Sequence, residues 1–278
     1  MKIKYLGTGA SEGIPSLFCN CPVCQSAIKN GGRDIRSRNQ ALIDDKILVD
    51  FPPDTFMHIV HGGLDLQSIH TCIITHSHSD HLYTSDIWAR KKMVSPILDD
   101  EGTPLDFYAT SVGFEQIDSL VKAHELDSEM RVRANLIEAF RPFTAEGYEI
   151  TPVRADHSPN TDPVLFILEK DGKAIFYAND TGRLPAQTVE YLKNCKKHFD
   201  LVSFDCTNGF NSGDKFHMNF KACCDTKKML CDFGLCDDNT KWVITHLCHN
   251  CGGTREQLEK EAEKLGFIAA YDSLEIEF

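Results

Sequence analysis

The chain has 278 residues, 42% of them hydrophobic, and a formal net charge of -12. A chain of this length can bury one substantial core, so we expect a single domain over residues 1–278. The negative charge disfavours a dedicated nucleic-acid binder, which normally presents a basic face. The start, Met1-Lys-Ile-Lys-Tyr-Leu6, is typical of a strand and not of a signal peptide, and no apolar run approaches about 18 residues. We therefore expect a cytoplasmic protein without a membrane partner, whose 12 cysteines stay mostly reduced.

Apolar runs predict alternating strands and helices along the chain. In the first half we expect strands at Ile3–Leu6, Ala41–Ile43, Ile47–Val49, Cys72–Thr75 and Phe107–Ala109, and helices at Pro53–His61 and Ser111–His124. In the second half we expect strands at Glu149–Val153, Val164–Glu169, Lys173–Tyr177, Leu201–Phe204, Trp242–Thr245, Phe267–Ala269 and Leu274–Glu277, and helices at Pro185–Lys197, Phe220–Leu230 and Thr254–Leu265. Asp171-Gly172 predicts a hairpin turn. This order favours an α+β fold in four layers, helix on sheet on sheet on helix.

The densest group of metal-binding side chains follows one of these strands. His76, His78, Asp80 and His81 lie within six residues, directly after Cys72–Thr75. Imidazoles and a carboxylate suit a borderline divalent cation such as zinc, manganese or iron. The alternative is a polar surface turn that contains three histidines by chance, and the position at a strand end disfavours it. The segment therefore indicates a two-metal hydrolase.

One such segment cannot fill two metal sites, so further ligands are expected at the ends of other strands. His157, Asp180 and His246 each follow a predicted strand. Taken singly, a histidine at a strand end is more often an ordinary polar residue. Together with the first segment, these residues form the pattern expected when a rigid sheet carries a site along one edge.

Three thiols near the amino terminus form a second group. Cys19, Cys21 and Cys24 lie within six residues, too close to pair well with one another but well placed around a tetrahedral zinc ion. The alternative is that they are free core cysteines. The predicted fourth ligand is His249, with Cys248 and Cys251 as competitors. We therefore expect a structural zinc clip over residues 19–24.

The succession of these motifs resembles the metallo-β-lactamase superfamily over nearly the whole chain. The resemblance implies an αββα sandwich with one metal held by His76, His78 and His157, the other by Asp80, His81 and His246, and Asp180 bridging both. Asp50, which follows Ile47–Val49, would orient an imidazole or the metal-binding turn. True β-lactamases usually carry a cysteine ligand where this chain has Asp180, so antibiotic hydrolysis is not expected.

The CxCxxC clip combined with the His246-x-x-His249 pair resembles the PhnP-type phosphoribosyl 1,2-cyclic phosphate phosphodiesterases of phosphonate metabolism. In that family the second histidine of the pair completes the structural zinc site. The resemblance further implies a leaving-group acid on a loop before a helix, for which His217 is the candidate, and a catalytic role for Asp80. A lone loop histidine is more often solvated surface. The chain departs from the family in a longer region around Leu98 to Met130 and in an acidic insert at Cys231–Asn239, and we expect both to reshape specificity.

The resemblance implies hydrolysis of a small cyclic phosphodiester, with 5-phosphoribosyl 1,2-cyclic phosphate converted to ribose 1,5-bisphosphate. Two divalent ions, zinc, manganese or iron, would activate water, and His217 would protonate the departing sugar oxygen.

One alternative is a phosphodiesterase for cyclic nucleotides or another small phosphodiester. A PqqB-like small-molecule-binding protein and a redox di-iron enzyme are disfavoured, because the first typically lacks a complete HxHxDH set and the second uses a Glu in that motif. A homodimer stays open, and Cys223-Cys224 has no assigned role.

Overall fold

A computed structural model describes residues 1–98 and 101–278 of the chain. Sheet 1 contains β1 (Lys2–Gly7), β2 (Gln40–Ile43), β3 (Ile47–Val49), β4 (Thr71–Ile73), β5 (Leu105–Ala109), β6 (Val132–Leu136) and β14 (Leu274–Glu277). Sheet 2 contains β7 (Phe143–Ala145), β8 (Tyr148–Arg154), β9 (Val164–Lys170), β10 (Lys173–Ala178), β11 (Leu201–Asp205), β12 (Lys241–Thr245) and β13 (Ile268–Ala269). The α-helices are α1 (Pro22–Asn30), α2 (Thr55–Val60), α3 (Ser111–Ala123), α4 (Ala186–Asn194), α5 (Phe220–Asp232) and α6 (Arg255–Lys264).

The two sheets share one plan. Sheet 1 runs β14-β1-β2-β3-β4-β5-β6, with antiparallel pairs up to β3 and parallel pairs beyond it. Sheet 2 runs β13-β12-β11-β10-β9-β8-β7, with parallel pairs up to β10 and antiparallel pairs beyond it. Because parallel strands end at the same edge of a sheet, each sheet delivers several strand ends to one place.

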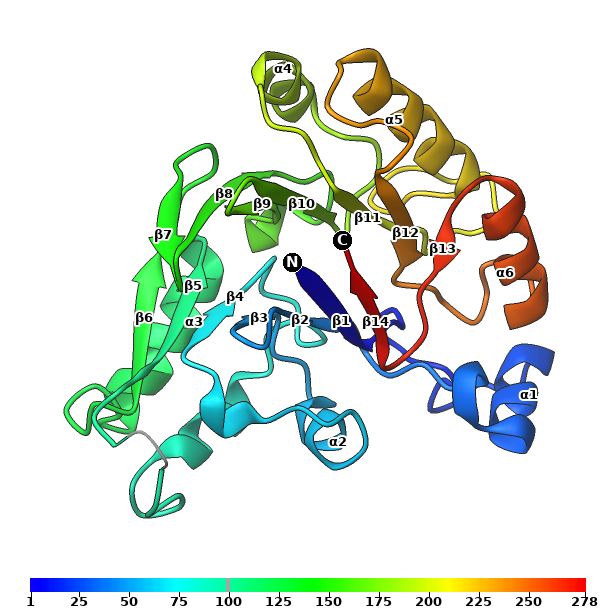
Figure 1. Cartoon of the computed structure of the whole chain (residues 1–278). Helices are drawn as coiled ribbons and strands as arrows, with labels where there is room; N and C mark the ends of the chain where they lie inside the picture. The colour runs from blue at the N-terminus through cyan, green and yellow to red at the C-terminus, as the bar shows by residue number, and fades with distance from the viewer. Residues whose placement is uncertain (99–100) are drawn as a thin grey trace.

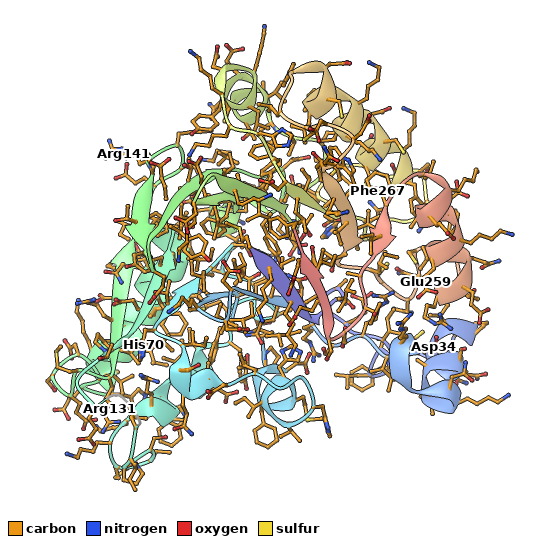
Figure 2. All side chains as sticks on the ribbon, in the orientation of Figure 1. Asp34, His70, Arg131, Arg141, Glu259 and Phe267 are labelled. Atoms are coloured by element: carbon orange, nitrogen blue, oxygen red, sulfur yellow. The ribbon has the colours of Figure 1, made fainter. Side chains whose placement is uncertain are left out.

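Three buried clusters fill the three interfaces between four layers. The central cluster joins sheet 1 to sheet 2 through residues such as Tyr5 and Phe166, and side chains fill this space in Figure 2. A second cluster lies between sheet 2 and helices α4, α5 and α6, and a third includes Phe107 of sheet 1 and Ile117 of α3. Figure 1 shows α4, α5 and α6 along the outer side of sheet 2 and α3 against the β5–β6 end of sheet 1. The predicted α+β sandwich is confirmed.

All the predicted strands and helices form, with ends that differ by up to three residues. The hairpin is also present, because Asp171 (φ 51°) and Gly172 (φ 75°) join β9 to β10 in the left-handed conformation that this turn requires. Helix α1 and strands β6 and β7 were not predicted. In the described part of the chain, none of the helices combines the length and the apolar composition needed to cross a membrane.

The structure corrects one expectation and leaves another partly outside its range. The segment Cys231–Asn239 closes α5 and leads into β12, and Leu235 accepts a hydrogen bond from Phe199 just before β11. It therefore lies at the start of β11 and β12, opposite the edge where these strands end and where the candidate ligands follow them, so it is not placed to reshape specificity there. The region Leu98 to Met130 contains β5 and α3 of the sandwich, and residues 99 and 100 of it lie outside the described residues.

Candidate metal centre

The candidate ligands, and Asp50 that supports one of them, lie where strands of both sheets end. Asp50 follows β3, Asp180 follows β10 and His246 follows β12. All three have left-handed backbones, with φ of 67°, 55° and 58°. Such conformations cost non-glycine residues about 1–3 kcal/mol and cluster at functional sites, where the surrounding structure maintains them. This edge therefore holds strained residues in place and is not a set of ordinary turns.

Three imidazoles converge in the first cluster. The Nδ1 of His78 lies 2.9 Å from the Nε2 of His76 and 3.1 Å from the Nε2 of His157. The Nδ1 of His157 lies 3.2 Å from the carbonyl oxygen of Phe216, which can only accept a hydrogen bond. That nitrogen therefore carries the proton, and the Nε2 lone pair points into the cluster. Burial lowers the pKa of His76 well below its ordinary value, so this ring is neutral, as a metal ligand must be.

The second cluster contains His81, His246, Asp80 and Asp180. The Nε2 of His81 lies 2.5 Å from Asp180 Oδ2, 3.3 Å from Asp80 Oδ2 and 3.3 Å from the Nε2 of His246. On the other side of the ring, Asp50 Oδ2 is 2.7 Å from the Nδ1 of His81. A carboxylate at Nδ1 fixes the tautomer and leaves Nε2 for the cluster.

A threonine performs the same task for His246. The hydroxyl of Thr207 lies 2.7 Å from the His246 carbonyl oxygen, to which it donates, and 2.7 Å from the ring Nδ1. Since the hydroxyl has one proton, it must accept from Nδ1, so Nδ1 is protonated and Nε2 is free.

Asp180 connects the two clusters. Its Oδ2 lies 3.6 Å from the Nε2 of His76 as well as beside His81, and its Oδ1 lies 3.2 Å from the Nε2 of His246. Among the residues that the structure describes, Oδ1 is buried without a hydrogen-bond donor. A buried carboxylate oxygen without a donor is costly, and a cation bound in the second cluster would satisfy it. The residues therefore fit the binding of divalent metal, and Asp180 contacts imidazoles of both clusters.

His217 lies beside the second cluster and is held by Asp205, a residue that we did not predict. Asp205 Oδ2 is 2.8 Å from the Nδ1 of His217, and its Oδ1 accepts from the backbone N–H groups of Thr207 (2.8 Å) and Met218 (3.2 Å). Burial opposes the charged ring, but Asp205 and then Asp180 raise the pKa of His217 to about 9. The available signal for Asp205 was its position at the end of a strand, the same signal that identified Asp180.

The predicted clip residues also meet. The ligand atoms of Cys19, Cys21, Cys24 and His249 all lie within 4.8 Å of one another. Burial favours the Cys21 thiol, but hydrogen bonds from the Cys24 N–H and from His249 outweigh it and lower the pKa of Cys21 to about 6. A thiolate is the form that binds zinc. The competitor Cys248 instead donates to the Thr207 carbonyl oxygen at 2.9 Å, outside this cluster.

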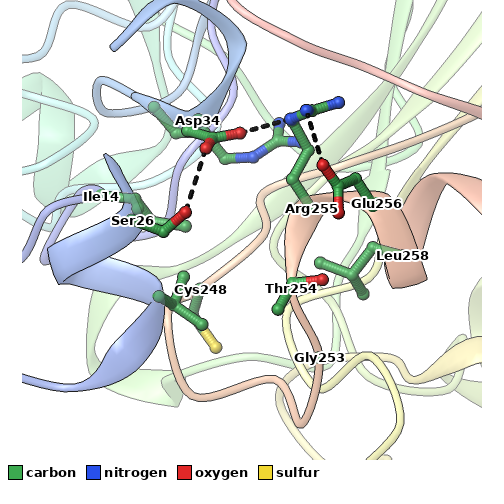
Figure 3. Close-up of a pocket in the computed structure, with 11 residues that line it drawn as sticks. Ile14, Ser26, Asp34, Cys248, Gly253, Thr254, Arg255, Glu256 and Leu258 are labelled. Carbon is green, nitrogen blue, oxygen red and sulfur yellow. Dashed lines mark hydrogen bonds and ion pairs between the residues drawn. The ribbon is translucent and has the colours of Figure 1, made fainter. Parts of the chain in front are cut away.

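The segment after the clip is fastened to α6. Arg255, at the start of α6, forms an ion pair with Asp34 of the facing segment. Within the helix, its Nη1 lies 2.7 Å from Glu259 Oε2; Asp34 and Glu259 are labelled in Figure 2. Figure 3 shows Arg255 reaching Asp34, which also accepts from Ser26 at 3.2 Å, around a cavity. The cavity has about 80 Å³, well below the roughly 300–1,000 Å³ of small-molecule sites. It is therefore a small gap between packed structural elements and not a substrate site.

A family model described as a β-lactamase superfamily domain matches residues 46–234. A protein from Porphyromonas gingivalis named octanoyltransferase is 26% identical over 93% of this chain, but the match covers 48% of that protein. The chain thus spans about half the length of this curated relative.

Solved structures resemble the whole fold. A crystal structure of a diphosphatase from the PhnP family is 20% identical, with a TM-score of 0.73 over 100% of this chain and 97% of that one. Zinc-bound PqqB from Methylobacterium extorquens is 18% identical, with a TM-score of 0.76 over the full length of both chains. At these identities the likeness concerns the fold.

Proposed function

The chain belongs to the β-lactamase superfamily, and from that premise we propose that it is a metal-dependent phosphodiesterase acting on a small cyclic phosphodiester. The family and the paired clusters support a metal-dependent hydrolase. The finer proposal takes 5-phosphoribosyl 1,2-cyclic phosphate as the substrate and ribose 1,5-bisphosphate as the product. It rests on the resemblance to the PhnP-type enzymes, which the combination of the clip with the His246-x-x-His249 pair carries.

One observation carries the proposal: two ligand clusters share Asp180, and His217 lies directly beside them. The Nδ1 of His217 is 3.3 Å from Asp180 Oδ1 and 2.8 Å from Asp205 Oδ2. Two divalent ions held by the clusters would supply Lewis acidity and a nucleophilic water at neutral pH. The ring of His217 would supply the proton that the sugar oxygen needs when the P–O bond breaks.

The proposed roles of the side chains follow from these contacts. Asp205 fixes the Nδ1 of His217, so the Nε2 of that ring is the nitrogen available to a substrate. A protonated Nε2 would give its proton to the departing sugar oxygen as general acid. Asp50 and Thr207 hold His81 and His246 in the tautomers that direct Nε2 to the cluster. In this proposal a dedicated side chain supports each of these functional imidazoles.

The direct test is turnover of cyclic and linear phosphodiesters by protein loaded with zinc or manganese. Asp80→Ala and His81→Ala each remove a proposed ligand, and we expect them to abolish hydrolysis while circular dichroism stays unchanged. Lys122→Met, at an exposed ion pair on α3, is the matched control and should retain activity. Wild-type-like turnover in either ligand variant would contradict the assignment, and hydrolysis of cyclic nucleotides in preference to the ribose phosphate would select the alternative substrate.

Two other activities are weaker candidates. A non-hydrolytic role like that of a PqqB-type protein conflicts with the complete set of His76, His78, Asp80 and His81. Acyl transfer is not proposed from the name of the Porphyromonas gingivalis protein, because the match covers 48% of it and the matching chain carries the metal-binding residues.

A further inference from the structure

Asp50 is restrained at its backbone as well as at its side chain. Its carboxylate accepts from the Thr75 N–H at 2.8 Å and lies 2.7 Å from the Nδ1 of His81. The residue is completely buried and has a φ of 67°. Because the carboxylate can orient His81 only if this strained turn stays fixed, whatever holds the Asp50 backbone also acts on the metal site.

The Asp50 carbonyl oxygen accepts a hydrogen bond from the side chain of Gln40. The distance from Gln40 Nε2 is 2.9 Å, and the same nitrogen lies 3.1 Å from the Thr55 hydroxyl. Thr55 donates its only hydroxyl proton to Pro52 at 2.7 Å, so it accepts from Gln40. Both amide protons of Gln40 are therefore committed, and its orientation is determined by the network.

His58 holds the other end of this amide. Its Nδ1 is 2.6 Å from Gln40 Oε1, which can only accept, so Nδ1 carries a proton. Its Nε2 is 2.8 Å from the Ser37 hydroxyl, which in turn lies 2.6 Å from Asp272 Oδ2. Burial lowers the pKa of His58 to about 4, so the ring is neutral and its proton lies on the Nδ1 that faces Gln40. The chain of contacts thus runs from the carboxyl-terminal strand region through α2 to the Asp50 turn.

We infer that Gln40 and His58 are positioning residues for the second metal site, acting through the Asp50 carbonyl and thereby on His81. This inference rests on the metal centre of the proposed function and deepens it. His58 belongs to neither ligand cluster, and the amide of Gln40 is committed to Asp50, Thr55 and His58, so both residues act through these contacts and not as ligands. A partner that orients a ligand directly, as Asp50 orients His81, typically contributes about 10- to 100-fold to metal affinity, and this range is the upper limit for residues that act through Asp50.

The test is a zinc titration of protein stripped of metal, followed with a chromogenic chelator as competitor. Asp80→Ala identifies which binding step belongs to the second site. Gln40→Met keeps the size of the side chain but removes its hydrogen bonds, and we expect it to weaken that same step by up to about 100-fold and to leave the binding step of the clip unchanged. His58→Leu should weaken the step in the wild-type background but add little to Gln40→Met, because it acts through Gln40.

A purely structural role predicts different results. Thr240→Val removes a buried hydrogen bond to Phe199 at the opposite edge of sheet 2, so it controls for a general loss of stability. If Gln40→Met lowered the melting temperature as Thr240→Val does but bound zinc like wild type, the inference would be overturned. Absence of a second zinc step in the wild type would overturn it together with the metal centre. Absence of phosphodiesterase activity alone would refute only the proposed reaction.

Discussion

Three imidazoles of the candidate metal centre, those of His81, His246 and His157, each have one nitrogen bound by a neighbouring group and one directed to a cluster. Asp50 holds His81, Thr207 holds His246, and the Phe216 carbonyl holds His157. These contacts determine which ring nitrogen of each histidine carries the proton. Contacts between one candidate ligand and another would not determine this. The residue scale therefore separates two functions, binding a cation and orienting the side chain that binds it.

His217 provides the most specific prediction at this scale. If it protonates the leaving oxygen, His217→Ala should slow hydrolysis of an alkyl or sugar phosphodiester by roughly 10²- to 10⁴-fold without changing metal content. A p-nitrophenyl ester needs less protonation and should lose much less. Asp205→Asn should show the same substrate dependence, because Asp205 acts by fixing the His217 ring. Equal losses on both esters would assign His217 to phosphate binding.

The buried ring of His58 predicts a pH dependence of stability. Burial lowers its pKa from 6.5 to about 4, so the unfolded chain binds a proton between these values that the folded protein excludes. The contribution of His58 to the unfolding free energy is therefore fully present above pH 6.5 and is lost as the pH falls towards 4. We expect the unfolding free energy of wild type relative to His58→Gln to fall by about 3 kcal/mol between pH 7 and pH 4. Asp272, whose pKa is raised, contributes the opposite slope in both proteins. Urea denaturation at several pH values measures this, and a pH-independent difference would contradict it.

The sequence predicted the candidate ligands but not all the residues that support them. In a dense segment such as His76 to His81, residue type and spacing are enough to predict candidate ligands. Asp205, Gln40 and His58 are single polar residues without a motif around them. Only the fold shows that Asp205 contacts His217, that Gln40 contacts the Asp50 turn and that His58 contacts Gln40.

At the scale of elements, strands with continuous apolar runs were predictable because burial imposes the pattern. β6 was missed because Arg133 and Asn135 interrupt its apolar character, and β7 is a three-residue edge strand. Helix α1 was hidden within the clip, where Cys21 is the N-cap and Pro22 the first helical residue. Here a single cysteine serves both as a candidate ligand and as a cap, so the motif masked the helix.

The clip makes a prediction about elements, because it fastens the segment before α1 to the loop between β12 and α6. Cys21→Ser would remove a proposed zinc ligand whose binding energy contributes to folding, so stability should fall before chemistry does. Cys231→Ser, at an exposed free cysteine, is the matched control. Melting temperatures measured without added metal should be lower for Cys21→Ser only. Equal values for parent and Cys21→Ser would show that the cysteines hold no structural ion.

At the scale of the whole molecule, two sheets of the same plan bring the ends of their strands to one edge. His76 and His81 come from sheet 1, whereas Asp180 and His246 come from sheet 2. The clusters are therefore completed only when the two sheets pack together, so the metal centre and the central core form together. Binding of metal to the folded state alone would in turn stabilise this packing.

The metal content of purified, unstripped protein tests the central claim most directly. The two clusters and the clip predict three metal ions per chain in the wild type, measured by elemental analysis against protein concentration. The double variant His76→Ala/His81→Ala removes a proposed ligand from each catalytic site and should retain one ion, the zinc of the clip. A content of one ion or fewer in folded wild-type protein would contradict the account.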